Sequence, residues 1–180
     1  MMTVYHVVTD RPMHAGQRIV FDDDHRSGVY SRVMAKMPQV EAIYAHPEQY
    51  DADKLEHHTR VALRELALEQ VRREKYPDLP SRMGCLYASF TLEEAEKWAG
   101  LFAEWGRPTY HIVQLSVDTW FTGDAWNCFA ATTNLQENLK LAERYWQNLP
   151  NTQGEPPMQE LLVAGNVTVE AIVKEINANI

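Results

Sequence analysis

The sequence has little cysteine and no long apolar run, and both absences narrow the class of protein. Its 180 residues include two cysteines, Cys85 and Cys128, which are too few for a disulfide framework. We therefore expect reduced thiols and a cytoplasmic location. No stretch approaches the roughly 20 apolar residues of a membrane-spanning helix, so no membrane partner is predicted. Residues 1–10 lack the basic start and apolar run of a secretory signal.

Positive charge is also scarce. The chain has 17 lysines and arginines against 25 acidic residues, a net charge of −8. Such a chain offers no broad basic face to DNA, although an enzyme that grips one or two nucleotides stays compatible with it. The seven histidines show no metal-ligand spacing, and the adjacent His57 and His58 would diverge on a helix. No metal site, glycine-rich phosphate loop or GxSxG motif is predicted.

Residue patterns predict a mixture of strands and helices without regular strand–helix–strand alternation. Predicted strands cover residues 3–9, 17–21, 84–89, 109–117, 159–163 and 167–173, with a tight turn at Gly165-Asn166 joining the last two. Predicted helices cover 27–36, 52–75, 91–105 and 134–147, and Pro38 and Pro47 bracket an irregular segment. This order favours an α+β fold with a mixed or antiparallel sheet, the 109–117 strand being central.

The helix at residues 52–75 is long and highly charged. Its apolar residues are Leu55, Val61, Leu63, Leu66, Leu68 and Val71. Two interpretations stay open: an amphipathic helix that covers the domain surface, or a contact surface for a partner chain.

Three short segments carry candidate chemistry. His6 lies in the first strand, Tyr87 in the segment GCLYAS before a helix that carries Trp98, and Glu160 opens an apolar strand. Each residue alone is typical of a structural role: a satisfied histidine, core aromatics, or a glutamate at a solvated sheet end.

Together and in this order, the segments VYHVVTDRPMHAGQRI, GCLYASFTLEEAEKWA and QELLVAGNVTVEAI resemble the ADP-ribosyltransferase superfamily. The first is similar to the branch that includes rifampin-modifying, DNA-modifying and tRNA 2′-phosphotransferase members. The resemblance implies one domain over residues 1–180, with a split mixed or antiparallel sheet, flanking helices and a helical insertion at about 27–80.

The resemblance also implies roles for individual residues toward NAD. His6 would bind the nicotinamide ribose hydroxyl, the Val7 backbone the nicotinamide amide, and Thr9 would contact NAD too. Tyr87 and Trp98, or Leu86 in their place, would stack on the nicotinamide ring. Glu160 would stabilise the oxocarbenium-like charge that grows as nicotinamide leaves.

Three positions depart from the family pattern. Val7 replaces a frequent glycine after the histidine, and Trp98 is about one residue out of register with the second stacking aromatic. Met158 occupies the position that holds glutamate or glutamine in members that modify arginine, which argues against an arginine acceptor. Residues proposed for the acceptor side are Asp118, Asp124, Asn127, Tyr145 and Trp146, while Trp120, Trp126 and Trp146 fit packing better.

The functional hypothesis is transfer of ADP-ribose from NAD to a nucleic acid or protein, in a bacterial toxin or defence enzyme with a neutralising protein partner. One alternative is phosphate transfer from RNA to NAD, which would use Arg11, Arg18 and Arg32 but has the acidic residues 22–24 beside it. The other is a binding module that has kept the fold and lost the chemistry.

Overall fold

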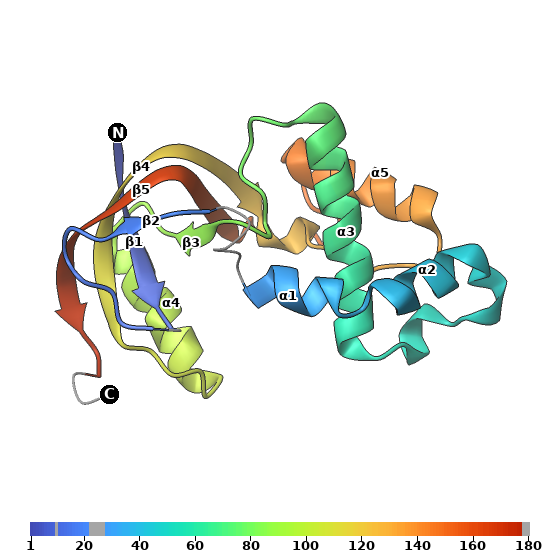
Figure 1. Cartoon of the computed structure of the whole chain (residues 1–180), viewed down its shortest axis with the longest axis horizontal. Coiled ribbons are helices and arrows are strands. Elements are labelled where there is room, and N and C mark those ends of the chain that lie inside the picture. The colour runs from blue at the N-terminus through green and yellow to red at the C-terminus, as the bar shows by residue number, and fades with distance from the viewer. Residues whose placement is uncertain (10, 22–27, 178–180) are drawn as a thin grey trace. The chain divides into compact units, whose positions relative to one another are not determined.

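The computed structural model describes all residues except 10, 22–27 and 178–180. Its contacts divide the chain into two compact units (Figure 1). The sheet unit comprises Met1–Phe21, Cys85–Phe121 and Glu160–Ile180, and the helical unit comprises Asp22–Gly84 and Thr122–Gln159. The segment at about 27–80, predicted as helical, therefore belongs to the helical unit, to which a later stretch of the chain also contributes.

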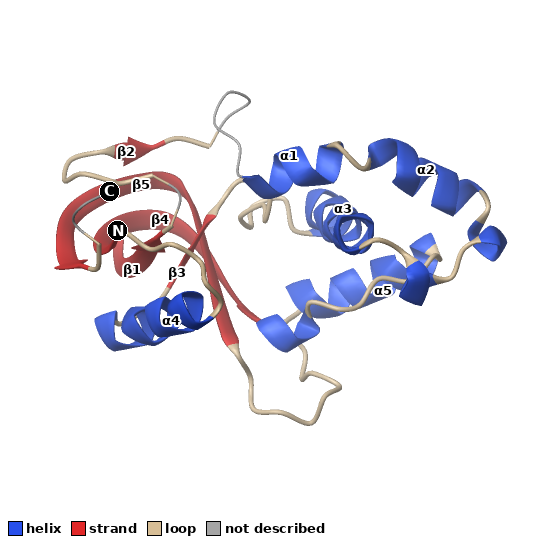
Figure 2. Cartoon of the chain, turned by 90° about the horizontal axis from the view of Figure 1, so that it is seen from below, coloured by secondary structure: helices blue, strands red, loops and turns tan. Residues whose placement is uncertain are grey.

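The sheet unit is built from five strands and one helix. The strands are β1 Met2–Val8, β2 Arg18–Ile19, β3 Leu86–Ala88, β4 His111–Asp124 and β5 Gln159–Glu175, and the helix is α4 Leu92–Glu104. The last residues of β4 and the first of β5 belong to the helical unit. Figure 2 shows β4 and β5 as long curved strands. A five-stranded sheet together with helices confirms the predicted α+β class.

The sheet has the strand order β1-β4-β5-β2, and β3 pairs with another part of β5. β1 runs antiparallel to β4, with His6 opposite Val113 and Val8 opposite His111. β3 runs antiparallel to β5, with Tyr87 opposite Leu162 and Ala88 opposite Leu161. β4 has a neighbour on both sides, which confirms its predicted central position.

The two faces of β1 pack against different residues. Val4 and Val8 face a core cluster that we call the valine core; its other buried members are Val113, Leu115, Val117, Leu161, Val163, Val167 and Val169. Val7 faces the opposite way, against Ala95 of α4 and Ile112 of β4. α4 begins as predicted, because the Thr91 hydroxyl accepts a hydrogen bond from the Glu94 amide at 3.1 Å.

The predicted hairpin at Gly165-Asn166 is wrong, because β5 continues through it as one strand. Gly165 has φ +72°, a backbone conformation that favours glycine. The carboxylate of Asp118, on β4, accepts hydrogen bonds from the Asn166 backbone N–H at 2.9 Å and from its side-chain amide at 2.7 Å. The polar groups of Asn166, which a local turn would have used, are therefore hydrogen-bonded to β4 instead.

The helical unit contains α1 Gly28–Met34, α2 Met37–Ala45, α3 His57–Lys75 and α5 Leu135–Trp146, with short 3₁₀ turns at Pro47–Gln49, Ala52–Lys54 and Ala125–Asn127. The irregular segment expected after Pro38 is wrong: Pro38 lies in the first turn of α2, where proline is tolerated. Asn134 caps α5 as predicted, accepting from the Glu137 amide at 3.0 Å. No helix in the described part of the chain is long and apolar enough to cross a membrane.

The long charged helix is shorter and more buried than its composition suggested. The predicted start at residue 52 falls in a 3₁₀ turn, and α3 begins at His57 after a cap by Glu56. α3 packs against α1, α2 and α5, and its Leu63 and Leu68 are fully buried. Glu65, also buried, accepts hydrogen bonds from Arg82, which in turn donates to the hydroxyl of Tyr145 on α5 at 2.9 Å. Part of the charge on α3 is therefore paired inside this unit.

Candidate functional site

The candidate site begins where β1 meets β3. Tyr5 and Ser89 form an isolated antiparallel pair and exchange two backbone hydrogen bonds of 2.8 and 2.7 Å. A regular antiparallel ladder would continue with a second pair, Val7 opposite Tyr87. Within the described residues the pairing of β1 with β3 stops at Tyr5 and Ser89, so the backbone ladder between the two strands ends at this bridge. We call this interruption of the ladder the β1–β3 gap.

The side chain of His6 takes the place of the missing ladder bond. Its Nδ1 lies 2.6 Å from the backbone carbonyl oxygen of Tyr87. Because a carbonyl only accepts, Nδ1 carries the proton, and the Nε2 of the neutral ring is left as a hydrogen-bond acceptor. His6 thus joins β1 to β3 at the edge of the gap, and its second ring nitrogen is a hydrogen-bond acceptor.

The surroundings of His6 favour its neutral form. Burial is the largest cause that lowers the pKa of His6 below its usual value. The hydrogen bond to the Tyr87 carbonyl raises this pKa, but the nearby Arg107 and His111 lower it further. At neutral pH the ring is therefore uncharged, which preserves the acceptor at Nε2.

The backbone N–H and C=O groups of Val7 are directed at the gap. Backbone N–H and C=O groups of alternate strand residues point to the same side, so those of Val7 point the same way as those of Tyr5, towards β3. No ladder partner on β3 takes them up within the described chain. The side chain of Val7 is buried and points away, against α4. A valine at this position thus still leaves its backbone available to a ligand.

The three candidates for the stacking position have different surroundings. Leu86 packs against the valine core, and Trp98 packs in the cluster of Val7, Ala95 and Ile112. The ring of Trp98 also lies 6.0 Å from that of Phe102, the next aromatic along α4. Tyr87 comes directly after Leu86 in β3, so its side chain points to the other face of the sheet, and it is 37% exposed. Among these three, Tyr87 has the side chain most open to a ligand.

Strand pairing brings Glu160 close to the same place. Ala88 is opposite Leu161, and one further step of this antiparallel register puts Glu160 beside Ser89, the partner of Tyr5. Directly opposed Cα atoms lie about 5 Å apart. Two such steps, from Tyr5 to Ser89 and from Ser89 to Glu160, put the Cα atoms of Tyr5 and Glu160 about 10 Å apart. By alternation, Glu160 shares a face with Tyr87, whereas His6 shares the other face with Val4 and Val8. A ligand that touches all three must therefore lie in the β1–β3 gap and not on one face.

Two residues that the sequence patterns did not single out lie near His6. The Arg107 guanidinium donates to the Thr9 hydroxyl at 3.1 Å and lies 4.8 Å from the Phe102 ring centre. His111 of β4 is buried and accepts a hydrogen bond from the Met13 backbone. Neither residue stands in a recognisable motif. The pairing of β1 with β4 brings His111 near His6, and a hydrogen bond to Thr9, the residue after β1, holds Arg107 nearby.

The residues expected on the acceptor side are held by protein contacts. Asp124 accepts from the Asn151 amide at 2.8 Å and from the Trp126 and Met158 backbone N–H groups at 3.0 Å each. Burial raises the pKa of Asp124, but these three hydrogen bonds outweigh burial and leave the pKa below its usual value. The other contacts are those of Asp118 with Asn166, of Asn127 with the Leu149 carbonyl, of Tyr145 with Arg82, and of Trp146 with the Leu68 carbonyl. These contacts are typical of structural roles.

The structure also locates the tryptophans expected to pack and the arginines considered for phosphate transfer. Trp146 is buried, as a packing role requires, whereas Trp120 is 43% exposed and Trp126 39% exposed. Of the arginines considered for phosphate transfer, Arg32 lies in α1 of the helical unit, while Arg11 and Arg18 belong to the sheet unit. The acidic residues 22–24 and the predicted cap Ser27 lie outside the described residues.

Comparison with known proteins identifies the family. The family described as "Protein of unknown function (DUF2441)" matches residues 4–176. The chain therefore belongs to the DUF2441 family. No curated protein matches it.

Proposed function

We propose that this DUF2441 chain is an NAD-dependent ADP-ribosyltransferase whose active site is the β1–β3 gap. The observation that carries the proposal is the interruption of the ladder between β1 and β3. There the His6 side chain takes the place of a backbone hydrogen bond, and the N–H and C=O of Val7 face β3 without a ladder partner among the described residues. The chemistry of these groups suits nicotinamide and its ribose.

The nicotinamide end of NAD has chemistry that complements this edge. Its carboxamide has both a donor and an acceptor, which match the N–H and C=O of Val7. Its ring is flat and cationic, which suits the partly exposed aromatic side chain of Tyr87. A ribose hydroxyl can donate to Nε2 of the neutral His6. These contacts would orient the glycosidic bond relative to β5.

Glu160 supplies the charge that the reaction needs. Cleavage breaks the bond between ribose C1′ and the nicotinamide nitrogen, and nicotinamide leaves with the electron pair. Positive charge then develops on the ribose, where the Glu160 carboxylate would stabilise it mainly in the transition state. An acceptor oxygen or nitrogen bonds to C1′ and loses its proton, and Glu160 is the proposed base for that step.

The proposed acceptor is a macromolecule, either nucleic acid or protein. Met158, two residues before Glu160, gives an arginine acceptor no carboxylate or amide at that position. A toxin or defence enzyme of this kind would act in the cytoplasm and would need a neutralising protein. If no protein encoded by an adjacent gene copurifies with the chain, that result would count against a role as a toxin with a neutralising partner.

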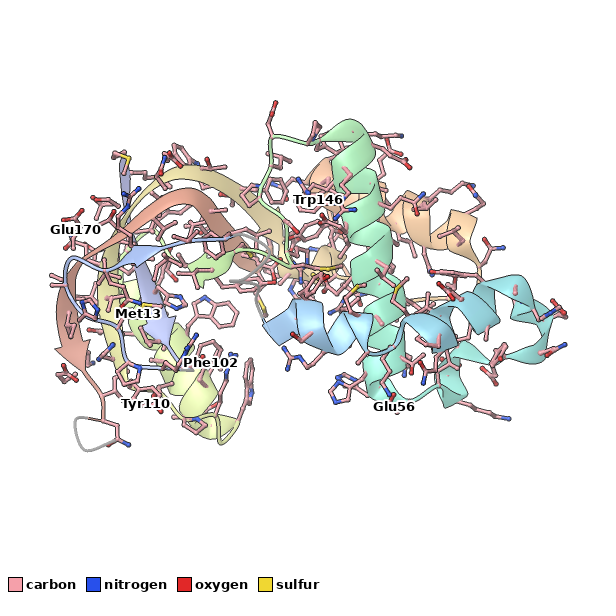
Figure 3. The ribbon with its side chains drawn as sticks, viewed as in Figure 1. Met13, Glu56, Phe102, Tyr110, Trp146 and Glu170 are labelled. Carbon is pink, nitrogen blue, oxygen red and sulfur yellow. The ribbon has the colours of Figure 1, made fainter. Side chains whose placement is uncertain are left out.

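Release of labelled nicotinamide from NAD tests the proposal. We expect Glu160→Gln to lower the release rate by about 100-fold or more, because a group that acts in the transition state is removed. Glu170→Gln is the matched control: Glu170 lies on the same strand (Figure 3), is exposed, and accepts a hydrogen bond from the Ser116 hydroxyl. If Glu160→Gln releases nicotinamide as fast as the wild type, the mechanism is wrong.

Calorimetry separates this proposal from the alternative of a non-catalytic module. An enzyme of this kind should bind NAD, and His6→Ala should weaken binding because it removes the ribose acceptor. Absence of heat from binding at millimolar NAD would favour a module that has kept the fold and lost the chemistry. Appearance of a phosphorylated NAD product with 2′-phosphorylated RNA would instead favour phosphate transfer.

A further inference from the structure

We infer that His111 is a positioning residue of this site: it holds the segment of residues 11–17, here called the Met13 segment, against the face of β1 that carries His6. This inference rests on the proposed function where it concerns NAD. The part that concerns the Met13 segment stands on hydrogen bonds and packing alone.

His111 opens β4 directly opposite Val8 of β1. Its side chain is 4% exposed, and its Nε2 accepts a hydrogen bond of 3.0 Å from the Met13 backbone N–H. Because an N–H group only donates, Nε2 is unprotonated and the neutral ring carries its proton on Nδ1. Nδ1 lies 3.7 Å from a carboxylate oxygen of Glu175 on β5, which faces the protonated nitrogen.

The Met13 segment is fixed at two places. At its far end the Gly16 N–H donates to the Val169 carbonyl at 2.7 Å, and the Val169 N–H donates to the Gln17 carbonyl at 2.8 Å. Nearer to β1, the side chain of Met13 packs against the valine core, and its backbone is bound to His111. Figure 3 labels Met13 within the sheet unit. The bond to His111 thus joins this part of the segment to the central strand.

His6 and His111 face the same side of the sheet. His6 alternates with Val4 and Val8, and His111 alternates with Val113 and Leu115, all members of the valine core. His6 is paired with Val113, so His111 is its diagonal neighbour on β4. The segment that His111 holds therefore packs on the same face of the sheet as the His6 side chain.

If the Met13 segment helps to shape the site, it contributes equally to binding of the substrate and of the transition state. Its loss is expected to raise KM while leaving kcat nearly unchanged. Loss of a catalytic group such as Glu160 would lower kcat instead. The ratio of these two effects distinguishes a positioning residue from a reacting one.

The experiment compares His111→Leu with His111→Gln in the full chain. Leucine fills a similar volume without an acceptor, whereas the Gln side-chain oxygen reaches about as far as Nε2 and restores one. Hydrogen exchange at the Met13 amide reports the contact directly, and nicotinamide release at varied NAD reports KM and kcat. Met13→Pro removes the donor and leaves His111 intact, which keeps the test valid if His111→Leu does not fold.

We expect His111→Leu to speed Met13 amide exchange and to raise KM for NAD, each by about three- to tenfold, as the loss of one hydrogen bond allows. We expect kcat to change less than twofold, Met13→Pro to give the same rise in KM, and His111→Gln to behave like the wild type. Unchanged Met13 exchange in His111→Leu would overturn the role in holding the segment.

Two further outcomes separate this inference from the proposed function. Equal KM values in the Leu and Gln variants, or a fall in kcat at constant KM, would overturn the positioning of NAD. A wild type that neither binds nor cleaves NAD would overturn the NAD part together with the proposed function. The exchange measurement would still decide whether His111 holds the segment.

Discussion

Replacing Gly165 with alanine is expected to destabilise the sheet unit by a predictable amount. Gly165 has φ +72°, and an L-residue in this left-handed region costs about 1–2 kcal/mol. An added Cβ would also overlap the Asp118 carboxylate and would lie 2.6 Å from the Thr119 hydroxyl oxygen. The overlap adds to the backbone cost, because Asp118 would have to leave its hydrogen bonds with Asn166. We therefore expect a loss of at least about 2 kcal/mol.

Two other glycines separate these contributions. Gly106 has φ +70°, but an added Cβ there meets nothing within 4 Å, so Gly106→Ala measures the backbone cost alone. Gly100 lies inside α4, also in open space, so Gly100→Ala should stabilise by about 0.5–1 kcal/mol. The excess of Gly165→Ala over Gly106→Ala then gives the cost of the overlap.

Urea unfolding followed by circular dichroism measures all three variants. With slopes of about 1–3 kcal/mol per molar urea, a loss of 2 kcal/mol moves the midpoint by about 1 M. If Gly165→Ala loses no more stability than Gly106→Ala, the overlap with Asp118 is not a constraint. If neither variant loses stability, the positive φ values are not a constraint either.

The other predictions concern buried polar groups and a helix cap. Arg82→Met should cost about 3–5 kcal/mol in unfolding free energy because it leaves Glu65 buried without this partner; adding Glu65→Leu should recover most of the loss, and no recovery would argue against the pair. Asp124→Asn should cost about 1–3 kcal/mol at pH 7. Since the pKa of Asp124 is lowered on folding, its stabilisation is present above the unfolded pKa and lost as pH falls through the folded pKa. The deficit of Asp124→Asn should therefore shrink in acid unfolding, and a constant deficit would contradict this. Thr91→Ala should cost about 1 kcal/mol by loss of the α4 cap, whereas an unchanged thermal midpoint would refute the cap.

Local features of the fold could be predicted from the sequence. The caps Thr91 and Asn134 were predictable because each side chain binds an amide three residues ahead. The turn at Gly165-Asn166 was not, because its polar groups bind Asp118 from a distant part of the chain. Pro38 gave the wrong signal because a proline breaks a helix interior but is accepted in a first turn.

In the candidate site, too, some features follow from local sequence and others depend on contacts between distant parts of the chain. His6, Tyr87 and Glu160 stand in segments that sequence patterns single out, and strand pairing brings these segments to one edge of the sheet. The position of His111 depends on the register of β4 with β1, and that of Arg107 on a contact with Thr9 far away in the sequence, so neither leaves a signal in the sequence. Whether the backbone N–H and C=O of Val7 pair with β3 depends on where the β1–β3 ladder stops, which is a property of the folded sheet.

A crystal structure of the chain soaked with NAD would decide whether this site binds the dinucleotide. We expect the nicotinamide ribose in the β1–β3 gap, with Nε2 of His6 and the Glu160 carboxylate each about 3 Å from hydroxyl oxygens of that one ribose. We also expect the nicotinamide carboxamide to be hydrogen-bonded to the backbone N–H and C=O of Val7. NAD bound elsewhere, or a gap that stays without NAD at millimolar concentration, would contradict this expectation.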